Sequence, residues 1–146
     1  MGLVIPSMLT RRDDWPERLA DVVGAAGSRP YVLGEWDCLR FACACIAAMT
    51  DVDFWPRFAG EYTTKREALR AIARISRDLE SAITLTLGVS PAPTFSSRRG
   101  DLVLFKDEAG DHIGVCLGGS VAVLGHAGLV PISLATPSLG PCWRVG

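Results

Sequence analysis

The sequence lacks any long apolar run and any excess of one sign of charge. No stretch approaches the roughly 20 apolar residues that a membrane-spanning helix needs, and even the most apolar one, residues 41–49, lies between Arg40 and Asp51. The 15 basic and 16 acidic residues give a formal net charge of −1 and form no long run of either sign. We therefore expect no membrane span, and composition gives no reason to expect nucleic acid or anionic lipid as a partner.

The sequence also lacks cysteine spacings that are typical of a metal site or of a disulfide framework. There are five cysteines, an odd number, with no pair spaced as CxxC. Cys43 and Cys45 fall in an apolar helical stretch and are expected to be small buried side chains. Cys116 and Cys142 have no neighbours that would activate them and are expected to be structural. No metal or cofactor is expected, and Cys38 is the one cysteine left to consider for chemistry.

The N-terminal residues do not have the pattern of a secretory signal. Their short apolar stretch is followed, rather than preceded, by Arg11 and Arg12. We therefore expect a soluble product made in the cytoplasm. A chain of 146 residues suffices for one domain with one core, so residues 1–146 are predicted to form a single domain.

Helical signals fill the first part of the chain. Asp13 and Asp14, followed by Trp-Pro-Glu at 15–17, predict a helix with a carboxylate cap that runs to about Ala26. The apolar stretch 39–49 predicts a central helix that is buried on most sides and begins at Asp37-Cys38. The segment 64–67, Thr-Lys-Arg-Glu, has the spacing of a capping box and predicts a third helix, with a shorter helical segment over 77–87.

Beyond residue 100 the pattern changes to short strands separated by turns. Turns at 107–110 and 118–119 predict that the first three strands form a meander. Helices first and strands afterwards predict an α+β domain, with a helical N-terminal part packed on an antiparallel sheet of about five strands. The expected strands are DLVLFK at 101–106, HIGVCL at 112–117, SVAVLGH at 120–126, VPISL at 130–134 and CWRV at 142–145.

Cys38 is a candidate nucleophile because of its place at the start of the predicted central helix. The helix dipole and the free backbone N–H groups of the first turn favour a thiolate there and could also bind an oxyanion. Asp37 is well suited to cap the same helix. On position alone, an ordinary buried cysteine is an equally good interpretation.

A nucleophilic thiol needs a base, and the chain has only two histidines. His112 lies at the start of a predicted strand, where its side chain could meet a helix terminus, although histidines in such places are often structural. His126 lies at the end of the next strand and could orient His112 through a hydrogen bond, or could simply be a turn residue between glycines. Asp111 is a rival orienting group, but alternation along a strand predicts that it faces away from the site.

Three segments together resemble NlpC-type papain-like cysteine peptidases. The segment 34–41, GEWDCLRF, resembles the nucleophile motif of that family, in which a glycine-containing loop leads to Asp-Cys and a buried helix. The segment 99–105, RGDLVLF, and the segment 112–118, HIGVCLG, resemble two of its strands. The motifs occur in the family's order and cover most of residues 31–134. The resemblance implies a papain-like fold with Cys38 as nucleophile, His112 as base and His126 as third member.

The resemblance also implies a substrate and a biological setting. The family cleaves amide bonds in the stem peptides of peptidoglycan, and the short chain is most similar to small NlpC-like proteins of phage tails and gene transfer agents. A protein of this kind would be made in the bacterial cytoplasm and incorporated in the virion. There it would contact other tail tip or hub proteins and act on the cell wall during genome delivery.

Two other functions fit the same residues. Leu39 and Arg40 stand where the family has small residues, so the chain could be a catalytically silent structural component of a tail tip or hub with a papain-like fold. An acyl or amide transferase could use the same cysteine and histidine. A transferase would attach an amine where a hydrolase leaves a free carboxylate.

Overall fold

A computed structural model describes residues 9–58 and 62–146, and its elements follow the order that the sequence predicts. The helices are α1 (Trp15–Ala26), α2 (Cys38–Thr50), α3 (Trp55–Phe58), α4 (Lys65–Ala73) and α5 (Leu79–Leu87), followed by a short 3-10 helix, η1 (Thr94–Ser96). The strands are β1 (Leu102–Asp107), β2 (Gly110–Cys116), β3 (Ser120–Gly125), β4 (Gly128–Ser133) and β5 (Leu139–Trp143).

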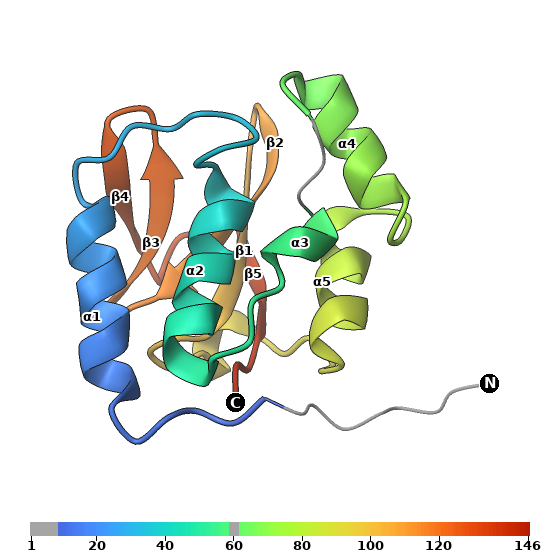
Figure 1. Cartoon of the computed structure of the whole chain (residues 1–146). Coiled ribbons are helices and arrows are strands. Elements are labelled where there is room, and N and C mark those ends of the chain that lie inside the picture. The colour runs from blue at the N-terminus through green and yellow to red at the C-terminus, as the bar shows by residue number, and fades with distance from the viewer. Residues whose placement is uncertain (1–8, 59–61) are drawn as a thin grey trace.

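The helices lie in front of one antiparallel sheet, with α2 across the middle of its face (Figure 1). The strand order is β4-β3-β2-β1-β5, so the first four strands form a meander and β5 returns to pair with β1. The predicted α+β class, the five strands and the meander are therefore confirmed. The apolar helix predicted over 39–49 corresponds to α2 and carries eight buried residues.

Capping interactions were predicted at the starts of three helices, and two of them are present in the structure. At α2, the side chain of Asp37 accepts a hydrogen bond from the backbone N–H of Arg40 at 2.9 Å. At α4, Thr64 and Glu67 form the predicted capping box. At α1 the helix is where it was expected, but the predicted carboxylate cap is wrong. Asp14 has φ −97° and ψ 23°, rather than the extended conformation of a typical cap, and its carboxylate pairs with Arg18 instead.

Apolar side chains fill both faces of the sheet. Between the sheet and the helices, α2 residues pack on side chains of β1, β2 and β3, and Cys43 and Cys45 lie in this core as predicted. A smaller cluster on the opposite face contains Cys116 and Cys142, which are also buried. All five cysteines are free thiols. None of the helices in the described residues has the length and apolar character to cross a membrane.

Asp101, directly before β1, connects segments that are far apart in the sequence. Its side chain is 2 % exposed and accepts hydrogen bonds from the backbone N–H groups of Arg98 and Val145 at 2.9 and 3.1 Å. The guanidinium of Arg11 pairs with the same carboxylate at 3.0 Å and also donates to the carbonyl of Val145. The Gly-Asp motif therefore has a structural role, because this carboxylate fixes both ends of the described chain to the sheet.

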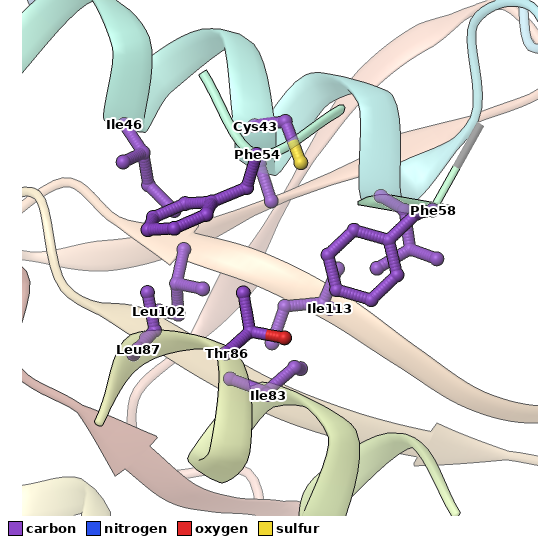
Figure 2. A pocket seen from close by; sticks show the side chains of 11 residues that line it. Cys43, Ile46, Phe54, Phe58, Ile83, Thr86, Leu87, Leu102 and Ile113 are labelled. Atoms are coloured by element: carbon purple, nitrogen blue, oxygen red, sulfur yellow. The ribbon is translucent and has the colours of Figure 1, made fainter. Parts of the chain in front are cut away.

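A small apolar void lies between the sheet and the helices α2, α3 and α5. Figure 2 shows Cys43, Phe58 and Thr86 among the side chains around it. Its volume of about 20 Å³ is close to that of one water molecule. The Thr86 hydroxyl is buried and has no hydrogen-bond partner among the described residues. The void is too small to hold a substrate, so the candidate site must lie elsewhere.

Candidate functional site

The candidate site lies at one end of the sheet, where α2 begins and two hairpins end. Figure 1 shows the first turn of α2, the β1–β2 turn and the β3–β4 turn at the same end of the molecule, with the loop before α2 passing over them. Strands β2 and β3 pair only through Val115 with Ala122 and Cys116 with Val121. The tips of the two hairpins are therefore free to diverge, which leaves room between them for a pocket.

Asp37 holds the loop before α2 in place. Its buried carboxylate accepts hydrogen bonds from the backbone N–H groups of Gly34 and Arg40 at 3.0 and 2.9 Å, and from the Tyr62 hydroxyl. Gly34 has φ +84°, and a Cβ there would come within 2.1 Å of the Tyr62 carbonyl oxygen. A glycine is therefore required at this turn. The result is a fixed backbone that presents Cys38 as the first residue of the helix.

The thiol of Cys38 lies against the backbone of β2. The N–H of Ile113, the residue directly after His112, faces the sulfur and favours its ionised form. Burial raises the pKa of the thiol to about 11, and the N–H groups of Ile113, Leu39 and Cys38 itself only partly oppose this effect. The sequence-based expectation that the helix terminus favours the thiolate is therefore not met, because desolvation outweighs the first-turn N–H groups.

His112 is held by an acidic residue that the sequence analysis did not consider. Its Nε2 lies 2.7 Å from Oδ1 of Asp107 at the end of β1, and this contact lowers the pKa of Asp107. In the hairpin, Phe105 pairs with His112 and Asp107 pairs with Gly110. Asp107 and His112 are therefore diagonal neighbours on one face of the sheet. Within the described residues, the imidazole bonds to this carboxylate and not to the thiol of Cys38.

His126 lies near His112 but does not orient it. It follows the end of β3, its ring packs edge-on against Tyr31 with 6.5 Å between centroids, and its carbonyl accepts the Tyr31 N–H. No hydrogen bond joins the two imidazoles within the described residues, which contradicts the orienting role predicted for His126. Asp111 is exposed and lies opposite Lys106 in the hairpin, next to His112 on the same strand.

A pocket of about 390 Å³ lies between the two histidines. Both histidines, Asp107 and Tyr31 line it, whereas Cys38 lies outside its lining, close to Tyr31. Burial and the neighbouring Cys38 and Asp37 raise the pKa of Tyr31 to about 12, so its hydroxyl remains protonated at neutral pH.

A second pocket of about 590 Å³ shares Phe105, Asp107 and Ile132 with the first. Together the two pockets have the size to receive several residues of an extended peptide. Within the described residues, no three His, Cys, Asp or Glu side chains come together as a metal site would require.

The raised pKa of Cys38 leads to a prediction about alkylation. A protonated thiol does not react, so the rate should rise about tenfold per pH unit between pH 7 and 9 as the thiolate fraction increases. Mass spectrometry after reaction with iodoacetamide would measure the rate of alkylation. The Cys38→Ser variant gives the background reaction of the four buried cysteines, which is subtracted. A rate that is already constant below pH 7 would contradict the prediction, because it would reveal a preformed thiolate–imidazolium pair.

The fold and the site define an α+β protein with a cysteine at a helix start, beside a strand that carries a histidine. Residues 10–145 match the sequence model of a domain of unknown function, DUF6950. The match covers nearly the whole chain, which therefore belongs to this family. No curated protein matches the chain.

Proposed function

We propose that this protein is a cysteine hydrolase of the NlpC type that cleaves amide bonds in peptidoglycan stem peptides, with Cys38 as nucleophile and His112 as base. The observation that carries the proposal is the contact between the Cys38 thiol and the N–H of Ile113. This contact places the first turn of α2 against the backbone of Ile113, the residue that follows His112 in β2. The resemblance of segments 34–41, 99–105 and 112–118 to that family is the second support.

The proposed reaction follows from the chemistry of these groups. Because the thiol is protonated at rest, His112 must remove its proton as the sulfur attacks the carbonyl carbon. The backbone N–H groups of Cys38 and Leu39, at the start of α2, are available to bind the oxyanion. The amine leaves with the proton from His112, and water then hydrolyses the thioester with His112 again as base. The free carboxylate of the product distinguishes hydrolysis from amide transfer.

The proposed setting is a phage tail or a gene transfer agent, where the protein would be part of the tail tip or hub. This part of the proposal rests on the resemblance alone. An assembled particle would concentrate the protein at the cell wall.

The test is an incubation of the purified chain with peptidoglycan sacculi, followed by detection of new amino termini and mass spectrometry of the released fragments. The expected result is time-dependent release of stem-peptide fragments with free carboxylates, absent with Cys38→Ala. Fragments that carry an added amine would identify a transferase. No release above that of Cys38→Ala would reject the hydrolase.

One set of observations favours a second function, a catalytically silent structural component of the tail tip or hub. Cys38 has a raised pKa, and the imidazole of His112 bonds to Asp107 rather than to the thiol. The bulky Leu39 and Arg40 follow the cysteine directly. A silent component would show no fragment release, yet would still bind to neighbouring tail proteins in a reconstituted particle.

A further inference from the structure

The Asp107–His112 pair carries an inference that rests on the proposed function and extends it. We propose that Asp107 is the positioning residue of the site: it holds the Nε2–H tautomer of His112 and leaves Nδ1 free to take the thiol proton. The family resemblance implies this role for His126, which does not bond to His112 in the structure.

The geometry of the pair decides which ring nitrogen carries the proton. A neutral imidazole has one N–H donor and one acceptor nitrogen. A carboxylate can only accept, so the 2.7 Å contact between Nε2 and Oδ1 of Asp107 requires the proton on Nε2. Nδ1 is then the acceptor. It is also the ring nitrogen nearer to the main chain, and the thiol of Cys38 lies against the peptide unit that joins His112 to Ile113.

Two further contacts restrict both partners of this bond. The Asp107 carboxylate also accepts the backbone N–H of Ala109 at 2.8 Å, which ties its side chain to the turn. The imidazole lies over the Phe105 ring with 5.9 Å between centroids, and its side chain is 25 % exposed. The carboxylate and the ring are therefore both held before any substrate arrives, as a positioning role requires.

Asp107→Ala tests the positioning role. Nε2 of His112 and the Ala109 N–H both bond to the same carboxylate oxygen, Oδ1, and alanine removes this acceptor, so the ring is no longer restricted to the Nε2–H tautomer. Asp107→Asn is the conservative variant, because an amide oxygen in the place of Oδ1 can accept both N–H groups. Asp111→Ala is the matched control, because it removes one carboxylate from the residue beside His112 without touching the imidazole.

Nitrogen-15 NMR of histidine-labelled protein reports the tautomer directly, and His126→Ala assigns the two ring spin systems. With the imidazole neutral, we expect the Nε2–H tautomer of His112 in the wild type, His126→Ala, Asp111→Ala and Asp107→Asn, and a mixture of both tautomers in Asp107→Ala. Loss of the carboxylate behind a catalytic histidine lowers kcat by about 10⁴-fold where it is buried. Asp107 is 43 % exposed, so we expect a fall of about 100-fold in Asp107→Ala, with little change in KM and with most of the activity retained in Asp107→Asn.

The two readouts keep this proposal distinct from the proposed function. If the wild type releases no fragments, the hydrolase is rejected, while the tautomer measurement still decides whether Asp107 orients His112. If Asp107→Ala keeps a pure Nε2–H tautomer, or retains full activity in an active protein, the positioning role is overturned. The same holds if His126→Ala, rather than Asp107→Ala, changes the tautomer of His112.

Discussion

Cys38→Ala is expected to lower kcat for release of peptidoglycan fragments by on the order of 10⁴-fold or more, because the covalent step of the proposed reaction has no other nucleophile. The remaining side chains could still bind the substrate, so fragment binding should persist. Single-turnover assays with a purified stem-peptide fragment would measure the rate. Circular dichroism would show that the variant keeps the fold, since the change removes one sulfur at a helix start.

Cys43→Ala is the matched control for this result. Cys43 lies on the same helix, but its thiol points into the apolar core beside the small void (Figure 2). Its removal should leave the rate unchanged while lowering the stability slightly. A Cys38→Ala protein as active as the wild type would end the proposed mechanism. Equal losses in both variants would show that the effect comes from the fold and not from the thiol.

The parts of the fold that local chemistry determines could be predicted from the sequence. The cap at Asp37 and the capping box of Thr64 and Glu67 depend on groups within three residues of each other, and both are present. The strand segments could be read from short apolar runs between turn residues. Asp14 shows the limit of such reasoning, because its carboxylate can also reach Arg18, one helical turn away, and that contact replaces the cap.

The partner of His112 depends on the hairpin register, which the sequence analysis did not assign. Once Asp107 is paired with Gly110, the turn contains only residues 108–109, and Asp107 becomes the diagonal neighbour of His112. The signal was therefore present in the turn Asp-Glu-Ala-Gly at 107–110. Placing His126 as the orienting group required β2 and β3 to pair up to their ends, whereas the structure pairs them only near the opposite end.

The pKa of Cys38 illustrates a quantity that no sequence pattern supplies. The favourable contribution of the first helical turn is local, and the sequence analysis identified it. Desolvation, however, depends on everything that packs around the sulfur, including the backbone of Ile113, 75 positions further along the chain. A nucleophile inferred from its helix position alone will therefore be assigned too low a pKa wherever the helix start is covered by a sheet.

Asp101 is the second residue whose replacement should have a large effect, and its role also arises from distant contacts. Arg11 is 90 positions away in the sequence and Val145 is 44. Burial lowers the pKa of Arg11, while the carboxylate of Asp101 raises it. Without that carboxylate, a guanidinium whose side chain is only 15 % exposed loses its main charge partner, and the backbone N–H groups of Arg98 and Val145 lose their acceptor.

Asp101→Ala is therefore expected to lower the free energy of unfolding by about 3–5 kcal/mol, as is typical when one member of a buried ion pair is removed. In urea unfolding followed by circular dichroism, the midpoint should fall by more than about 1 M. Asp14→Ala, which removes an ion pair exposed on α1, should leave the midpoint nearly unchanged. Similar midpoints for the two variants would show that Asp101 does not hold the chain ends to the sheet. Loss of stability in Asp101→Ala alone would establish that the Gly-Asp motif serves the fold, leaving the chemistry to Cys38 and His112.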